Sequence, residues 1–220
     1  MNLSNIDQAR FNMIEQQIRP WNVLDTTILA LLGEVPREDF VPVAHRALAF
    51  ADLEIPLGHG ECMLAPRMEA RLLQDLQVQP NERVLEIGAG SGYMAALLAH
   101  RAVSVLSLEI QPELAAMAQD NLQRAGVRNA QVRVADGAKA LRSEGPFDAI
   151  MLSGSVAEVP QHLLDLLAVG GRLIAVVGDE PIMCATLVTR VSPTELQSTK
   201  LWDANAPRLH GFAEHSHFHF

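Results

Sequence analysis

A glycine-rich turn is the feature of this sequence with the clearest chemical meaning. Residues 84–93 read Val-Leu-Glu-Ile-Gly-Ala-Gly-Ser-Gly-Tyr, which predicts a buried strand, a turn and the start of a helix. Glycines at this place let a ligand approach the backbone closely, and the N-terminus of the helix presents free N–H groups. A dinucleotide fingerprint would need its third glycine at position 93, where Tyr93 stands. The spacing therefore favours a different ligand.

Two acidic positions follow the next predicted strands. Glu109 ends the second strand, where a carboxylate can accept hydrogen bonds from both hydroxyls of a ribose. Asp136 and Gly137 end the third strand, where a side chain and a flexible backbone can meet the edge of an adenine. Ligands of open α/β sheets bind outside the carboxyl ends of the strands, so the turn and these acids predict a single site.

Glu86, two residues before the first glycine, completes a pattern that resembles the turn with which class I methyltransferases hold S-adenosylmethionine. The resemblance implies that S-adenosyl-L-methionine is the cofactor. The residues that it implies for the cofactor site are Glu86, Gly88, Ala89, Gly90, Ser91, Gly92, Glu109, Asp136 and Gly137.

The elements that must position these residues alternate from residue 83 onward between short apolar runs and helical stretches. This rhythm predicts an α/β fold, a Rossmann-like, doubly wound and mostly parallel sheet with right-handed crossovers. A turn at 192–193 separates two further runs and predicts an antiparallel hairpin at one edge of the sheet. The expected strands are 84–87, 103–108, 132–134, 147–152, 172–177, 184–191 and 195–202, and the expected helices are 92–100, 112–125 and 160–167.

The first eighty residues have a different pattern. Apolar residues Phe11, Ile14 and Ile18 predict one face of a first helix, and a second helix is expected at 25–33. Residues 36–60 are rich in proline and glycine and predict a lid or wall and no sheet, whereas Pro66 is expected to begin a helix. We therefore expect residues 1–80 to form a helical and loop extension that supplies part of the active-site wall, and residues 81–220 to bind the cofactor, within one integrated domain.

Composition narrows the possible partners and the compartment. With 17 basic and 26 acidic residues, the formal charge is −9, which disfavours broad attraction to nucleic acid or to an anionic membrane. The two cysteines cannot build a disulfide framework or a four-thiolate zinc site. The first residues lack the apolar stretch of a secretory signal, and the most apolar window, 166–178, is too short to cross a bilayer. We expect a cytoplasmic protein without nucleic-acid or membrane partners, and the oligomeric state stays open.

The segment after the fourth strand bears on the methyl acceptor. Methyltransferases that act on amino groups of bases or amides carry a proline-rich run there, whereas residues 152–156 read Leu-Ser-Gly-Ser-Val. Metal-assisted catechol methylation needs clustered carboxylates, and this segment has none. Base methylation and metal catalysis are therefore both disfavoured.

Three N-terminal segments carry a more specific resemblance. They are Met-Ile-Glu-Gln-Gln-Ile-Arg at 13–19, Val-Pro-Arg-Glu-Asp-Phe-Val-Pro at 35–42 and Ala-Asp-Leu-Glu-Ile-Pro-Leu-Gly-His-Gly at 51–60. Together with the cofactor turn, Phe-Asp-Ala-Ile at 147–150 and Gly-Gly-Arg-Leu at 170–173, they resemble the protein-L-isoaspartate O-methyltransferases over residues 10–200. The resemblance implies an enzyme that methylates isoaspartyl carboxylates in damaged proteins and peptides, which starts their repair.

One segment departs from the family pattern. The family continues with Gln-Thr-Ile-Ser-Gln-Pro, whose serine lies at the active site, whereas residues 61–66 read Glu-Cys-Met-Leu-Ala-Pro. Leu64 thus stands in place of the serine, Cys62 in place of the threonine and Ala65 in place of the glutamine. No residue is assigned a catalytic role. The candidates for binding the acceptor are Gly58, His59, Leu64, Pro66 and Ser153.

The departure leaves alternatives open. A carboxylate acceptor is already ionised at neutral pH and needs no general base, so the lack of a recognisable base is neutral evidence. A small-molecule alcohol or phenol would need a base, for which His59 is a candidate. A third alternative is a protein that binds the cofactor with weak or no catalysis. The histidines at 210, 215, 217 and 219 are expected to be a polar surface and not a metal site.

Overall fold

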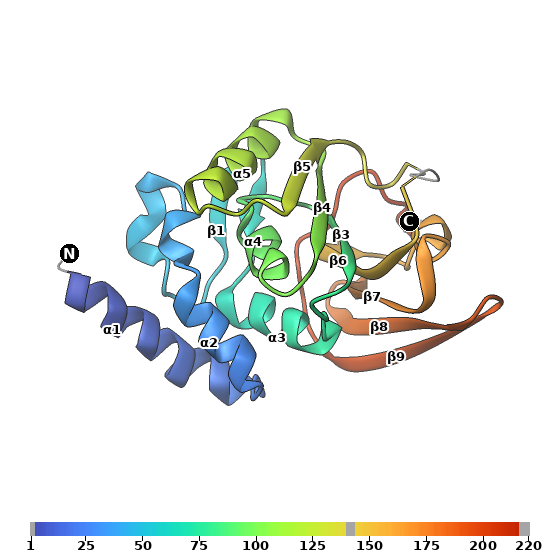
Figure 1. The fold of residues 1–220 in the computed structure, drawn as a ribbon, viewed down its shortest axis with the longest axis horizontal. Helices are drawn as coiled ribbons and strands as arrows, with labels where there is room; N and C mark the ends of the chain where they lie inside the picture. The colour runs from blue at the N-terminus through green and yellow to red at the C-terminus, as the bar shows by residue number, and fades with distance from the viewer. Residues whose placement is uncertain (1–2, 140–143, 216–220) are drawn as a thin grey trace, which may run out of the picture.

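The computed structural model describes residues 3–139 and 144–215, and its main feature is a seven-stranded sheet (Figure 1). The strand order is β5-β4-β3-β6-β7-β8-β9, in which β5 to β7 are parallel and β8 and β9 are antiparallel additions at one edge. The strands are β3 (Arg83–Ile87), β4 (Ser104–Glu109), β5 (Ala130–Val134), β6 (Phe147–Val156), β7 (Leu167–Asp179), β8 (Ile182–Ser192) and β9 (Glu195–Asp203). The predicted sheet and its edge hairpin are confirmed.

Helices cover both faces of this sheet. The longer ones are α1 (Leu3–Met13), α2 (Thr26–Glu34), α3 (Pro66–Leu76), α4 (Tyr93–Ala99) and α5 (Pro112–Arg124), and α6 (Gln161–Leu164) is a single turn. Short helical turns occupy Ile14–Ile18, Arg19–Trp21, Arg37–Asp39 and Val43–Leu48. Figure 1 shows α1 and α2 beside α3 on one side of the molecule and the long β8–β9 hairpin on the other.

Local sequence explains where these helices begin. The side chain of Asp25 caps α2 by accepting a hydrogen bond from the N–H of Thr27 at 2.8 Å. Pro66 is the first residue of α3, as predicted, and the four-residue spacing of Met68, Leu72 and Leu76 places all three in the core.

The chain builds two apolar cores because successive residues of a strand face opposite sides of the sheet. Val84 packs into the core that also holds the N-terminal helices, whereas Leu85 and Ile87 pack into the second core with residues of β6, α6 and β7. Glu86 lies between them in sequence and is fully buried. The strand that leads into the glycine turn is therefore anchored on both faces.

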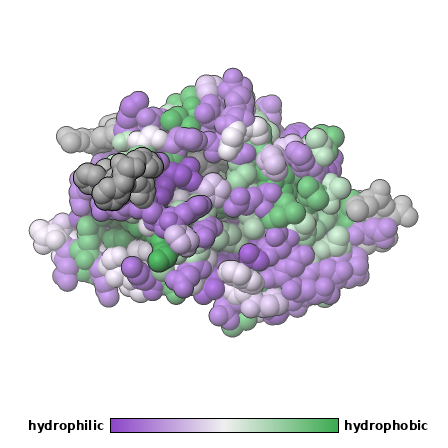
Figure 2. Space-filling model, turned by 180° about the vertical axis from the view of Figure 1, so that it is seen from behind, coloured by the Kyte–Doolittle hydropathy of each residue, from purple (hydrophilic) through white to green (hydrophobic). Residues whose placement is uncertain are grey.

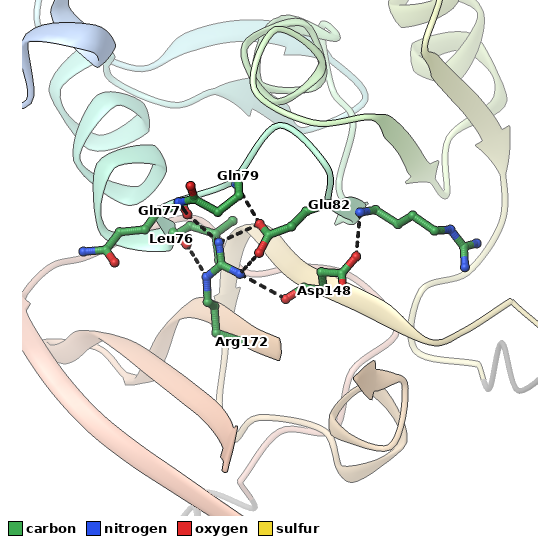
Figure 3. Close-up of polar contacts among 7 residues, drawn as sticks. Leu76, Gln77, Gln79, Glu82, Asp148 and Arg172 are labelled. Carbon is green, nitrogen blue, oxygen red and sulfur yellow. Dashed lines mark hydrogen bonds and ion pairs between the residues drawn. The ribbon is translucent and has the colours of Figure 1, made fainter. Parts of the chain in front are cut away.

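At the amino ends of the strands, one arginine ties several elements together (Figure 3). All five N–H groups of Arg172 on β7 are used. They donate to the carbonyls of Leu76, Gln77 and Asp148 at 2.6, 2.5 and 3.3 Å, and to both carboxylate oxygens of Glu82 at 2.6 and 2.8 Å. The end of α3, the segment before β3 and the start of β6 are thereby fixed to one guanidinium group.

The N-terminal extension differs from the prediction in two places. Residues 36–60, expected to contain no sheet, lead into a two-stranded antiparallel hairpin of β1 (Ile55–Gly58) and β2 (Glu61–Met63). Phe11, expected on the buried face of the first helix, is 58% exposed, and Met13 is buried together with Ile14 and Ile18. The helix widens to a π-type turn at Ile14–Ile18, and this shifts which residues face the core.

The surface of the molecule is mostly polar. On the face shown in Figure 2, hydrophilic residues dominate and hydrophobic residues gather in smaller patches between them. Within the residues described, no helix combines the length and the apolar character that crossing a membrane would require.

Candidate functional site

The glycine turn between β3 and α4 has a backbone that only glycine adopts easily. Gly88, Gly90 and Gly92 have φ values of +89°, +50° and +83°. The N–H of Gly88 donates to the carbonyl of Leu108 at 2.8 Å, which ties the turn to β4. A Cβ on Gly92 would lie 3.0 Å from the carbonyl oxygen of Ala118, so glycine also allows α4 to pack against α5. The sequence pattern thus reflects both backbone shape and close packing.

Beside this turn lies a hollow of about 500 Å³, open to solvent, which we call the first hollow. The three predicted features meet here, because its walls include Gly88 and Gly90 of the turn, Glu109 at the end of β4 and Gly137 after β5. The remaining lining residues are Glu61, Cys62, Ile87, Leu108, Ile110, Ala135, Ser153, Leu209, His210 and Phe212. The carboxyl edge of the parallel strands therefore carries the cavity, as the sequence predicted.

The two predicted acids differ in their surroundings. Glu109 is 5% exposed, and its carboxylate accepts hydrogen bonds from the N–H of Gly90 at 2.8 Å and of Gln111 at 3.0 Å. Asp136 accepts from the N–H of Ala138 at 3.0 Å and pairs with Lys139. Burial raises the pKa of Asp136, but the contacts with Lys139 and Ala138 outweigh it, so the pKa is lowered and the group is ionised at neutral pH. Glu109 also holds the turn in shape.

Residues 206–215, which we call the C-terminal strap, form the outer wall of the first hollow and were not predicted as part of the site. The strap is bound to the end of β6 through the backbone of Ser155. Its carbonyl accepts from the N–H of Leu209 at 2.9 Å, and its N–H donates to the carbonyl of Pro207 at 2.7 Å. His210 Nε2 lies 2.8 Å from Oε1 of Glu61 on β2, and the ring of Phe212 stacks on that of His162.

The strap is anchored beyond the hollow as well. Arg208 donates to the carbonyl of Gly178 and to a carboxylate oxygen of Asp179, both at 2.9 Å. His215 contacts Asp179 at 2.5 Å and Glu158 at 3.1 Å, and these carboxylates raise the pKa of His215. The signal in the sequence was weak, since Leu209 and Phe212 are the two large apolar residues of the strap.

A second cavity, of about 310 Å³, adjoins the first hollow on the side of β2 and α3. We call it the second hollow. Cys62, Gly88, Gly90 and Ser153 line both cavities, which therefore share a boundary. The other lining residues are Met63, Leu64, Glu69, Glu86, Ala89, Ser91 and Met94. The divergent run at 61–65 thus forms a wall of this second hollow.

A buried arginine holds that wall. Arg37 is fully buried, donates to the carbonyl of Leu64 at 2.7 Å and to that of Ala49 at 3.1 Å, and pairs with Glu69. Its guanidinium lies over the ring of Tyr93, 5.2 Å from the ring centre. Burial raises the pKa of Glu69 to about 7, although the charge of Arg37 opposes this shift. The hydrogen bond from Arg37 therefore holds the backbone of Leu64 in place.

Glu86 is the most strongly perturbed acid of the site. It is fully buried, and its two oxygens lie 2.5 Å from the hydroxyl of Ser107 and 2.8 Å from the hydroxyl of Ser153. Burial raises its pKa to about 8, and the neighbouring carboxylates of Glu109 and Glu69 act in the same direction, against the two hydroxyls. A neutral carboxyl group at physiological pH is the physical consequence.

The structure does not bring every predicted residue to the cavities. His59 has a φ of +58° at the exposed tip of the β1–β2 hairpin, next to Gly58, and Pro66 is buried at the start of α3. These three are outside the lining of both hollows, whereas Leu64 and Ser153 line the second. Of the predicted cofactor residues, Gly92 and Asp136 are also outside both linings. Burial, followed by nearby carboxylates, raises the pKa of the Cys62 thiol to about 12, so Cys62 stays protonated.

The prediction about metal binding concerns the histidines at 210, 215, 217 and 219. Among residues 3–139 and 144–215, no group of three or more histidine, cysteine or acidic side chains is arranged to hold a metal ion. Two of the four histidines, at 217 and 219, lie outside the described residues.

Solved structures support the same architecture. A crystal structure of a protein-L-isoaspartate O-methyltransferase from Plasmodium falciparum, in complex with S-adenosyl-L-homocysteine, matches with a TM-score of 0.75 over 92% of this chain and 97% of its own. Sequence identity in that match is 23%, so the likeness shows the fold.

Sequence relatives are closer. Protein-L-isoaspartate O-methyltransferase from Methanoculleus marisnigri is 42% identical over 184 residues, which are 84% of this chain and 83% of the relative. The enzyme of the same name from Koribacter versatilis is 37% identical over 206 residues, 94% of this chain and 91% of the relative. The family profile described as protein-L-isoaspartate(D-aspartate) O-methyltransferase matches residues 8–201. With the glycine turn, the acids and the N-terminal signatures in place, the chain belongs to the protein-L-isoaspartate(D-aspartate) O-methyltransferase family.

Proposed function

We propose that this protein is an S-adenosylmethionine-dependent O-methyltransferase that methylates isoaspartyl carboxylates in proteins or peptides. The single observation that carries the proposal is the meeting of the glycine turn, Glu109 and Gly137 around the first hollow, in a chain that belongs to this family. The second hollow, which adjoins the turn, is the place for the acceptor.

The residues present fit an adenosyl cofactor. The first hollow is open to solvent, and the backbone of Gly88 and Gly90 forms part of its wall, so a ligand can approach the glycine turn directly. A side chain on Gly88 would enter the cavity space beside Leu209, because its Cβ would lie 2.9 Å from Cδ2 of that residue. A Cβ on Gly137 would lie 2.5 Å from Cγ2 of Ile87. Glycine at 88 thus leaves room beside Leu209, and glycine at 137 lets the chain after β5 pack closely against Ile87, which lines the hollow.

The proposed binding roles follow the order of the strands. Glu109 would accept the ribose hydroxyls with lone pairs that the N–H groups of Gly90 and Gln111 leave free. Asp136 and Gly137 would meet the adenine edge. The remaining contacts would come from Glu86 and from residues 88–92, with the backbone of the turn closest to the ligand.

The chain supplies alignment and a dry site. When bound, S-adenosylmethionine supplies an activated methyl group on a sulfonium centre, so a carboxylate acceptor needs no general base. Leu64 is 5% exposed and Met94 3%, and these side chains form an apolar part of the wall of the second hollow. Holding two reactants in line in such a place lowers the barrier by several kcal/mol. Arg37 keeps the Leu64 wall in position.

The extension at residues 1–80 takes part in the site in this proposal. Its hairpin strand β2 contributes Glu61 to the first hollow and Cys62 to both, and α3 contributes Glu69 to the second. The extension and residues 81–220 would then act as one integrated domain.

Transfer of a labelled methyl group tests the proposal. Isoaspartyl peptide should accept a base-labile methyl ester, whereas the same peptide with an ordinary aspartyl residue should not. Tight binding of S-adenosyl-L-homocysteine without any transfer would contradict the acceptor assignment. Leu64→Ser combined with Ala65→Gln should raise the rate, because the pair restores a hydroxyl group at the wall of the second hollow and an amide beside it.

A further inference from the structure

Ser153 occupies the boundary between the two hollows. It follows the part of β6 that pairs with β3, it is partly exposed, and it lines both cavities. A Cβ on Gly88 would lie 3.8 Å from the Cβ of Ser153, so the serine stands directly beside the cofactor turn. Its hydroxyl is therefore placed where cofactor and acceptor would meet.

Few other side chains of the described second hollow can donate a hydrogen bond to an acceptor carboxylate. Leu64 and Ala65 have no polar hydrogen, and the Cys62 thiol lies 3.6 Å from a carboxylate oxygen of Glu54. Ser91 is only 3% exposed, so its hydroxyl is less accessible than that of the partly exposed Ser153. Ser153 is the hydroxyl that the divergent wall leaves available.

The direction of the Ser153 hydroxyl depends on Glu86. If Glu86 is ionised, both of its oxygens accept, the Ser153 proton points to Glu86, and only lone pairs of Ser153 face the hollow. If Glu86 is protonated, Ser107 donates to one oxygen while the carboxyl O–H donates to Ser153. The Ser153 proton is then free to point into the hollow. Only the protonated arrangement suits an anionic acceptor.

The surroundings of Glu86 favour the protonated form. The ionisable groups that face it are Glu109 on β4 and Glu69 on α3, and both are carboxyl groups. Arg37 lies behind Glu69 and is paired with it. Full burial and these neighbours raise the pKa of Glu86 to about 8. At neutral pH, Glu86 therefore keeps its proton.

We propose that Ser153 binds the acceptor carboxylate through a donated hydrogen bond, and that Glu86 is the positioning residue that turns the Ser153 hydroxyl toward it. The inference rests on the proposed function and names the side chain that replaces the polar run missing at 61–65. No proton is transferred in this contact. The carboxyl group of Glu86 keeps its proton before and after the methyl transfer.

The test measures initial rates of S-adenosyl-L-homocysteine formation with an isoaspartyl peptide between pH 6.5 and 9.5. This readout does not depend on survival of the methyl ester at alkaline pH. Ser153→Ala should lower kcat/KM about 10-fold to 100-fold, because it removes a hydrogen bond to a charged group. Ser153→Thr keeps the hydroxyl and should recover most of the loss. Calorimetric titration with S-adenosyl-L-homocysteine verifies that each variant is folded.

Ser155→Ala is the matched control. Ser155 lies on the same strand, and its buried hydroxyl makes no hydrogen bond within the described structure and faces neither hollow. Its removal should change kcat/KM less than twofold. An equal loss in Ser153→Ala and Ser155→Ala would overturn the proposal.

The pH profile of kcat/KM shows whether Glu86 positions the Ser153 hydroxyl or only supports the fold. The native kcat/KM should fall above pH 8, as Glu86 ionises and the Ser153 proton turns back to it. Glu86→Gln should abolish this fall, because an amide does not titrate and can donate to Ser153 while it accepts from Ser107 at every pH of the assay. The proposal for Ser153 and Glu86 is overturned if kcat/KM of Glu86→Gln still falls above pH 8, or if Ser153→Ala keeps full activity. Neither result would overturn the proposed function. A native chain that binds S-adenosyl-L-homocysteine but never methylates the peptide overturns the proposed function too.

Discussion

The two ends of the parallel sheet use polar groups in opposite ways. At the amino ends, every N–H of Arg172 donates to a carbonyl or to Glu82, so Arg172 has no hydrogen-bond donor left for a ligand (Figure 3). At the carboxyl ends, Gly88 and Gly90 open a hollow, and the carboxylate of Glu109 keeps lone pairs free beside it. Fully paired groups stabilise the fold, and partly paired groups beside open space can bind.

A substitution at the amino ends of the strands should therefore lower stability without changing ligand affinity. Arg172→Met should lower the free energy of unfolding by about 3 kcal/mol, because it leaves the half-buried Glu82 carboxylate and three carbonyls without their partner. The affinity for S-adenosyl-L-homocysteine should stay within twofold. Urea unfolding and calorimetric titration measure the two quantities. Arg19→Met removes an exposed ion pair with Glu15 and should leave the free energy of unfolding nearly unchanged, because solvent screens exposed pairs.

A matched pair of glycine substitutions should have the opposite result, in which ligand affinity differs between the variants and stability does not. Gly88→Ala places a methyl group in the first hollow and should weaken binding of S-adenosyl-L-homocysteine by about 100-fold, or roughly 2.7 kcal/mol. Gly170 has a similar φ, +84° against +89°, and a Cβ there meets nothing within 4 Å. Both variants should lose about 1–2 kcal/mol of stability to backbone strain. Equal affinities would show that Gly88 matters only for the turn.

Glu109 gives a smaller effect at the same end of the sheet. Glu109→Gln removes a charge and one of the acceptors that hold the N–H groups of Gly90 and Gln111. We expect affinity for S-adenosyl-L-homocysteine to fall about 10-fold by calorimetry. Glu113→Gln, an exposed acid on the first turn of α5, is the control and should leave affinity unchanged.

The stability of the fold should also depend on pH. The folded state raises the pKa of Glu86 to about 8 and of Glu69 to about 7, so it binds more protons than the unfolded chain above pH 5. The free energy of unfolding should therefore fall as pH rises from 5 to 8, by at most about 1.4 kcal/mol per pH unit for each group. Urea unfolding of Glu86→Gln should show a shallower slope, and identical slopes would contradict this assignment.

Sequence alone predicted the sheet because its strands are short apolar runs bounded by glycine, proline and helical spacing. The same signals gave a wrong prediction at 36–60. There Pro56 and Gly58 indicated a loop without sheet, although both lie in the hairpin strand β1. Phe11 was misplaced because a helical period assumes 3.6 residues per turn, and the π-type turn after Met13 breaks that period.

The cofactor turn could be predicted because its glycines are dictated by local backbone shape. The C-terminal strap could not, since Leu209 and Phe212 reach the site through a parallel bridge between Arg208 and Ser155 that has no local signature. The buried pairing of Arg37 with Glu69 likewise joins residues far apart in the chain. Long-range contacts of this kind depend on the whole fold.

The anchors of the strap connect the first hollow to the turn between β7 and β8. Arg208 and His215 both reach Asp179 there, while Leu209 and Phe212 face the cavity. A ligand that binds only the closed strap makes opening of that turn rarer. Backbone amides at 178–183 should then exchange with deuterated water more slowly when S-adenosyl-L-homocysteine is bound, so this turn would report occupancy without touching the ligand.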